Sequence, residues 1–181
     1  MKTKIVLFFA IGMLISCMNP QPRKPVSIKT VSEDETSILL NKSIIKNEEA
    51  VFKALMAKDS LTAYIASPNG FWYTYNVKST NLQLPEVGDK ILYTFDVFNV
   101  ENNLIYGAQE IGLQSYVVDK QELLEGLRNG LKLMHEGDVV TFLFPSHKVY
   151  GYAGDQNKIG INQSLIYKVQ LIKINKKNES N

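Results

Sequence analysis

Residues 122–134 read ELLEGLRNGLKLM. The apolar residues of this stretch recur at helical spacing, and Asp119 and Glu122, three positions apart, predict a capping pair at the start of the helix. Two glycines, Gly126 and Gly130, lie inside the predicted helix, where each costs about 1 kcal/mol relative to alanine. They indicate that the helix backbone closely approaches a neighbouring element.

Four runs of alternating apolar and polar residues lie on either side of this helix. They span residues 71–77, 91–97, 140–144 and 165–171. Alternation with a period of two is typical of half-buried strands in an antiparallel sheet. The sequence therefore predicts an α+β domain in which one helix faces one antiparallel β-sheet.

The N-terminus predicts an export signal. Residues 1–16 contain two lysines followed by an apolar run at residues 5–15, which is shorter than the roughly 20 residues that a membrane-spanning helix needs. Residues 14–17 (LISC) resemble the lipobox of bacterial lipoproteins, which implies that Cys17 is acylated and anchors the chain to a membrane. The alternative is a buried free thiol in an unprocessed helix.

Composition divides the rest of the chain. Residues 17–40 contain three of the six prolines and predict a flexible tether. Residues 41–69 predict a helical extension, because the apolar residues from Ile44 to Met56 return to one helix face. Such a face packs on the domain or on a second copy of the chain, so a homodimer is one expectation. Residues 70–174 form the domain, and residues 175–181 form a polar tail.

Charge and residue counts exclude several kinds of function. The chain has 20 Lys and Arg against 18 Asp and Glu, and the balance becomes 18 against 18 once the two lysines of the leader are removed. Such a chain has no bulk attraction for nucleic acid. One cysteine excludes an internal disulfide, and two histidines leave little for a metal cluster, so we expect neither a metal nor another cofactor.

Few residues suggest covalent catalysis. The sequence has no phosphate-binding glycine loop and no G-x-S-x-G motif. Ser146 and His147 are neighbours, which leaves a hydrolase open as an alternative, although adjacency rarely places the hydroxyl on the imidazole nitrogen. His135 falls at the end of the predicted helix, where a cation interacts favourably with the last carbonyls.

Five stretches of the predicted domain share their order and spacing with one family. They are residues 87–89 (VGD), 122–134, 136–138 (EGD), 149–151 (VYG) and 165–172 (LIYKVQLI). Together they resemble the FK506-binding-protein (FKBP) type of peptidyl-prolyl cis-trans isomerase. The resemblance implies a twisted antiparallel sheet wrapped around the helix, and proline-containing polypeptides as clients.

The resemblance also implies a set of site residues. The catalytic set would be the hydroxyl of Tyr150, the ring of Phe95 and the backbone N–H of Leu124. The substrate-binding walls would be Ile105, Tyr106, Leu123, Ile159 and Tyr167, with Leu127 as the floor. Taken one at a time, the apolar members fit ordinary core packing equally well.

Four positions depart from the pattern of the family. Tyr106 stands where an acid is usual, and Leu127 stands where a tryptophan often forms the floor. Gln114 replaces an aromatic residue of the flap, and residues 160–162 (GIN) replace paired prolines. These departures favour a second hypothesis, in which the fold binds proline-bearing segments of an envelope machine with slow turnover or none.

The lipobox, the predicted helix at residues 44–56 and residues 69–73 (NGFWY) together resemble the gliding-motility-associated lipoproteins of this family. This resemblance implies an isomerase that assists folding of exported proteins in a bacterial envelope and faces the periplasm. Met18, which follows the cysteine where an aspartate would imply retention at the inner membrane, favours the outer membrane.

Overall fold

The computed structural model describes residues 31–177. The predicted leader, Cys17, most of the predicted tether and the end of the predicted tail lie outside the described residues. Residue contacts divide the chain into two units, residues 1–36 and 37–181. Apart from the first residues of one helix, everything described below belongs to the second unit.

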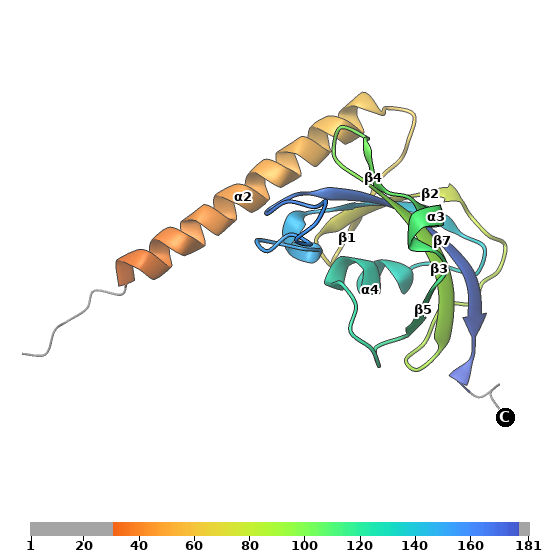
Figure 1. The fold of residues 1–181 in the computed structure, drawn as a ribbon. Coiled ribbons are helices and arrows are strands. Elements are labelled where there is room, and N and C mark those ends of the chain that lie inside the picture. The colour runs from red at the N-terminus through yellow and green to blue at the C-terminus, as the bar shows by residue number, and fades with distance from the viewer. Residues whose placement is uncertain (1–30, 178–181) are drawn as a thin grey trace, which may run out of the picture. The chain divides into compact units, whose positions relative to one another are not determined.

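An antiparallel sheet dominates the fold. Its strands are β1 (Ile65–Ser67), β2 (Phe71–Val77), β3 (Lys90–Phe98), β4 (Leu104–Tyr106), β5 (Gln114–Val117), β6 (Val139–Phe144) and β7 (Leu165–Asn175). The strand order is β1-β2-β6-β7-β3-β4, and β5 pairs with β3. The helices are α2 (Val31–Lys58), α3 (Ala108–Ile111) and α4 (Glu125–Leu131), with a 3₁₀ turn at Ser146–Lys148. Figure 1 shows the strands curving around α4, which confirms the predicted α+β class.

Each face of the sheet carries its own apolar cluster. Along β2, Phe71 faces the main core together with Leu127 of α4 and Phe142 of β6. The next residue, Trp72, faces the opposite side and packs against Phe52 of α2, with ring centroids 5.9 Å apart. The alternation of a strand therefore lets one sheet bind α4 on one face and α2 on the other.

The predicted boundaries of the tether and the helical extension are wrong. Helix α2 begins at Val31 rather than near residue 41, because all the prolines of the tether precede Val31 and residues 31–40 contain no proline or glycine to interrupt a helix. Beyond the end of α2, residues 65–67 form strand β1 instead of helix. A turn with Gly70 at φ 78° returns the chain to β2.

The predicted capping pair is also wrong. Helix α4 begins at Glu125, and its N-cap, Leu124, has no side-chain capping hydrogen bond. Asp119 lies in a turn with φ 53°, where Lys120 N–H donates to the carbonyl of Val117, and its carboxylate pairs with a lysine instead. This turn keeps the residues after β5 out of the helix.

The predicted place of His135 needs a similar correction. Helix α4 ends at Leu131, so His135 lies in the following turn and not at the helix end. Its Nδ1 is 3.2 Å from a carboxylate oxygen of Asp138. The ring therefore lies against a carboxylate side chain rather than against the last carbonyls of the helix.

The predicted close approach of α4 is confirmed. A Cβ at Gly126 would lie 2.8 Å from the ring of Phe144 and 3.0 Å from the carbonyl oxygen of Lys148. A Cβ at Gly130 would lie 2.9 Å from the ring of Phe142. These contacts are closer than carbon atoms normally approach, so only glycine lets α4 pack this tightly on β6.

Gly126→Ala is expected to lower the free energy of unfolding by about 1–2 kcal/mol, because overpacking outweighs the better helix propensity of alanine. In an exposed helix a glycine-to-alanine change raises the free energy of unfolding. The sign of the change in this variant therefore tests whether α4 is tightly packed at residue 126. Urea denaturation measures it, with Asn129→Ala on the same helix as the control, expected to be neutral or slightly stabilising. A variant at residue 126 as stable as the parent would show that α4 has room to shift.

Candidate functional site

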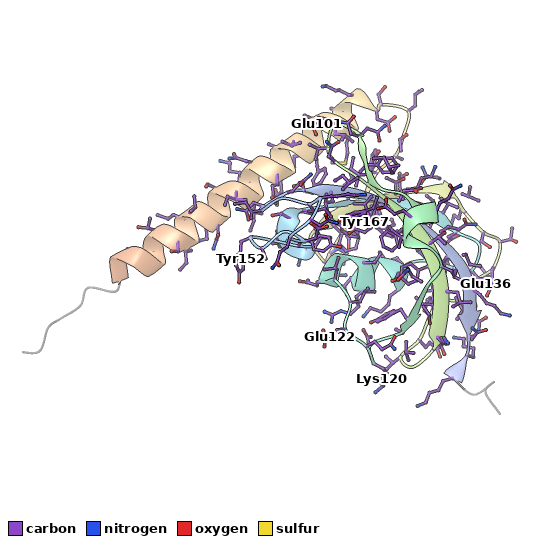
Figure 2. The ribbon with its side chains drawn as sticks, in the orientation of Figure 1. Glu101, Lys120, Glu122, Glu136, Tyr152 and Tyr167 are labelled. Atoms are coloured by element: carbon purple, nitrogen blue, oxygen red, sulfur yellow. The ribbon has the colours of Figure 1, made fainter. Side chains whose placement is uncertain are left out.

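The structure brings all nine predicted site residues into one cluster around α4. Leu127, Ile159 and Tyr167 are buried members of the main core, and the other six pack against it while half-buried: Tyr150, Phe95, Leu124, Ile105, Tyr106 and Leu123. Figure 2 shows Tyr167 among the side chains of the domain interior, whereas Tyr152 lies at its edge. Their roles in binding or catalysis stay a prediction.

Aromatic rings form one side of this cluster. The ring of Tyr167 stacks on that of Phe95 with centroids 5.3 Å apart, and Phe144 meets Tyr167 edge-on at 5.5 Å. Tyr167 is fully buried, whereas Phe95 is only half-buried. Phe95 therefore presents a supported ring at the boundary between core and solvent, where an apolar ligand could contact it.

Leu124 supplies a backbone donor at the start of α4. Its carbonyl accepts the N–H of Arg128 at 2.9 Å, which begins the helix. Among the hydrogen bonds of residues 31–177, none uses the N–H of Leu124. The donor that the family pattern predicts for a substrate carbonyl is therefore free.

The hydroxyl of Tyr150 is protonated at neutral pH. Burial raises the pKa of Tyr150, contact with the Tyr167 hydroxyl opposes this, and the charge of Asp155 raises it further. The Tyr167 hydroxyl is buried without a partner of ordinary hydrogen-bond geometry. The two phenol hydroxyls interact electrostatically without a formed hydrogen bond, which leaves Tyr150 able to donate to a ligand.

Tyr106 is tied to the loop that carries Tyr150. Its hydroxyl donates to Oδ2 of Asp155 at 2.5 Å, and Oδ1 of Asp155 accepts the N–H groups of Asn157 and Ile159 at 2.9 and 2.7 Å. Burial alone would raise the pKa of Asp155, but these hydrogen bonds lower it. A loop carboxylate thus lies beside the position where the family usually has an acid.

Sequence reasoning missed Asp155. A local signal existed, since an aspartate that bonds the backbone two residues on is typical of turns. The bond to Tyr106 joins residues 49 positions apart and has no signal in a single sequence.

Asp155→Ala is expected to loosen this loop, because it frees the Tyr106 hydroxyl and two backbone N–H groups together. Trypsin cleavage after Lys158, within the loop, should become severalfold faster at unchanged global stability. Asp59→Ala, which removes an exposed carboxylate near Tyr64, is the matched control. Equal cleavage rates for parent and Asp155→Ala would contradict the role of the Asp155 hydrogen bonds.

The structure also places the two other positions at which the sequence departs from the family pattern. Gln114 begins β5, and its side-chain amide donates to the carbonyl of Ile111 at 3.0 Å, so it closes a turn. In the segment that lacks paired prolines, Ile161 is 70% exposed.

Helix α2 lines a cavity beside Tyr150, which the sequence did not predict. A cavity of about 390 Å³ is lined by Asn41, Ile44, Ile45, Ser146, His147, Val149, Tyr150, Gly151, Tyr152 and Asn162. The sequence assigned Ile44 and Ile45 to packing alone. Their helical spacing was visible, but nothing in the sequence showed that α2 lies next to the Tyr150 loop.

Ser146 and His147 form no catalytic pair. The N–H of Ser146 donates to Glu48 at 3.2 Å, and no hydrogen bond joins the Ser146 hydroxyl to the imidazole of His147. The hydrolase alternative therefore has no nucleophile activated by a base. Within residues 31–177, no three His, Cys, Asp or Glu side chains gather as metal ligands, and none of the helices there has the length and apolarity to cross a membrane.

Residues 83–172 match the sequence model of the FKBP-type peptidyl-prolyl cis-trans isomerases. Over these residues the chain is similar to an FKBP-type domain. The chain is also 38% identical, over 53 residues, to a probable FKBP-type isomerase, FkpA, of Neisseria meningitidis serogroup B. That match covers 29% of this chain and only 20% of the relative, about a fifth of its length.

Two solved structures share the fold of this chain. A peptidyl-prolyl cis-trans isomerase of Pseudomonas syringae aligns with a TM-score of 0.60 and 16% identity over 75% of this chain and 96% of the other. FkpA of Escherichia coli aligns with a TM-score of 0.61 and 14% identity over 98% of this chain and 83% of the other. At such identities the likeness establishes the fold alone.

Proposed function

We propose that this chain is a membrane-anchored peptidyl-prolyl isomerase that acts on proline-containing segments of exported proteins. The observation that carries the proposal is the cluster of nine predicted residues within an FKBP-type domain, with a protonated phenol and a free backbone N–H at its half-buried side. The family supports the isomerase class.

The chemistry needs no covalent catalyst. Rotation about an X-Pro bond meets a barrier of about 18–20 kcal/mol, because amide resonance is lost as the bond twists. A twisted amide is less dipolar than a planar one, so a site that removes water from the carbonyl favours the transition state. Phe95 and Tyr167 would hold the proline ring, and Tyr150 and the N–H of Leu124 would hold the carbonyl.

A protease-coupled isomerisation assay on Leu-Pro and Phe-Pro peptides tests the proposal. We expect a rate above the uncatalysed one that rises linearly with protein concentration. A rate equal to the uncatalysed one would remove the enzymatic function.

A binding module without turnover is the second candidate. Two observations favour it: Leu127 is 1% exposed and leaves no large floor ring, and the Tyr106 hydroxyl is already bonded to Asp155. This candidate predicts that fluorescent proline peptides or unfolded clients bind, and that aggregation is suppressed, in the absence of catalysis.

The anchor, the location and the link to gliding motility rest on the sequence. Acylation of Cys17 would hold the domain at the periplasmic face of a membrane, more readily the outer one, and Cys17→Ser should release it to the soluble fraction. Deletion of the gene would show whether gliding stops or whether only one exported client protein is lost, which separates the two roles.

A homodimer through α2 belongs to the same proposal, since Ile38, Leu39 and Leu40 are more than half exposed.

A further inference from the structure

Helix α2 carries two apolar residues that do not take part in its packing on the sheet. Phe52 holds the helix as a fully buried member of the apolar cluster on the α2 side of the sheet. Ile44 and Ile45, further towards the start of the helix, are half-buried but belong to neither apolar cluster of the described residues. Their side chains line the cavity beside Tyr150.

The loop that carries Tyr150 adds an exposed ring to the same cavity. Val149 and Tyr150 are half-buried, whereas Tyr152 is 86% exposed at the edge of the domain (Figure 2). Apolar side chains that gather at the surface, and not in the core, are typical of binding sites. The volume of about 390 Å³ is also that of a ligand pocket.

Among the residues that the structure describes, none that lines this cavity is charged at neutral pH. Besides the tyrosines, the polar members of the lining are two asparagines, Ser146 and His147. Burial and the charge of Lys148 lower the pKa of His147 from its ordinary value of 6.5, although nearby glutamates oppose the shift, so the imidazole is neutral at pH 7. A charged group would lose hydration here without gaining an ionic partner, whereas an apolar group would gain burial.

Hydrogen bonds hold the walls of the cavity together. Glu48 of α2 accepts the N–H of Ser146 at 3.2 Å, which ties the helix to the turn before Tyr150. The N–H of Gly151 donates to the carbonyl of Ser146 at 2.8 Å, and the N–H of Asn162 donates to the carbonyl of Gly151 at 2.7 Å. The cavity is therefore formed before a ligand binds, which lowers the entropy cost of binding.

The position of Tyr150 defines the occupant. Its hydroxyl would hold a carbonyl of the client, and the same residue lines the cavity. A polypeptide advances at most about 3.6 Å per residue, so residues one or two positions from that carbonyl are still beside Tyr150. One of their side chains can then enter the cavity.

We infer that Ile44, Ile45 and Tyr152 form an apolar subsite for one large aliphatic or aromatic side chain of the client, close to the proline. Both isoleucines lie outside residues 83–172, the part that matches the family model, so the subsite is a feature that α2 adds. The inference rests on the proposed function and narrows its clients to proline segments with a large apolar residue nearby.

Matched peptides test the inference in the full chain. Fluorescent peptides contain one proline, and a single leucine is scanned over three positions on either side of it. Each is compared with the peptide that has alanine at that position. We expect leucine to strengthen binding about five- to tenfold at one or two adjacent positions, because part of its side chain leaves water. A ratio of one at every position would overturn the inference.

Variants identify the residues responsible. In Ile44→Ala/Ile45→Ala the helix is kept and the apolar wall is lost, so the leucine-to-alanine ratio should fall towards one while the alanine peptide binds as before. Tyr152→Ser, at a position too exposed for the change to unfold the domain, should lower the ratio in part. Val51→Ala shortens a 45% exposed side chain of the same helix and should keep the parent ratio. A ratio unchanged in both the double variant and Tyr152→Ser would assign the preference to the cluster around α4 and overturn the inference.

A second copy of the chain is the competing occupant of the cavity. Sedimentation equilibrium of the parent and of Ile44→Ala/Ile45→Ala distinguishes it from a client. A client subsite predicts the same mass for both proteins. A parent dimer that becomes a monomer in the double variant would assign the cavity to the second copy and remove the client subsite.

The result is separable from that of the proposed function. Turnover of proline peptides with no leucine preference that depends on Ile44 and Ile45 would leave the isomerase and remove the subsite. A leucine preference in binding that is lost in the double variant, when no peptide is turned over, would retain the subsite and remove catalysis.

Discussion

Replacing Tyr150 with phenylalanine is expected to lower kcat/KM for a Phe-Pro peptide by about 10- to 100-fold. The change removes one hydroxyl and keeps the ring, so the loss corresponds to leaving the substrate carbonyl without its donor, at about 1–3 kcal/mol in a site shielded from water. Protease-coupled kinetics measure the effect. Phe95→Ala should lower kcat/KM as well, because it removes the half-buried ring that stacks on Tyr167.

Tyr64→Phe is the matched control for Tyr150→Phe. It also removes a phenol hydroxyl, but from a residue that packs on the α2 side of the sheet and bonds Asp59 at 3.3 Å. Its kinetics should equal those of the parent. Equal rates for the parent and Tyr150→Phe would eliminate Tyr150 as the donor.

The pH dependence of activity provides a second check on Tyr150. Because the pKa of Tyr150 is raised above the ordinary value of 10.0, the donor form is present at every pH below that value. The rate should therefore stay constant with respect to this group between pH 6 and 9 and decline only in strong alkali. A loss of activity centred near pH 8 would assign the essential proton to another group.

Replacing Asp138 with alanine is expected to destabilise the domain by about 3 kcal/mol. Asp138 is fully buried, and its carboxylate accepts the N–H of Ser79 at 2.6 Å and the N–H of His135 at 2.7 Å. Alanine leaves both donors without a partner, at about 1–3 kcal/mol each. Urea denaturation, with the slope checked for two-state behaviour, measures the change.

Glu49→Ala is the control for the Asp138 variant. Glu49 forms an exposed ion pair with Lys53 at 3.5 Å within helix α2, and such pairs contribute no more than about 1 kcal/mol. Similar losses for the two variants would mean that the Asp138 carboxylate is not the centre of this network. Asp138→Asn, which keeps one acceptor oxygen, should fall between alanine and the parent.

The long elements of the fold could be predicted because their signal is local. Strands β2, β3, β6 and β7 each contain several alternating residues, so their faces were visible in the chain. Strands β1 and β4 have three residues each, which is too short for any period. The start of α4 was misplaced because the turn at Asp119 competes with a helix cap, and both use the same residue types.

The sequence by itself determined the α+β class, the main strands and the tight packing of α4, because periodicity and the two glycines are properties of neighbouring residues. The nine site residues came from the likeness to a family. Only the tertiary structure decided that α2 lies beside Tyr150, that Asp155 meets Tyr106, and that Glu48 bonds Ser146, 98 positions away. Such contacts depend on which surfaces meet when the sheet closes, and no local pattern of residues encodes that choice.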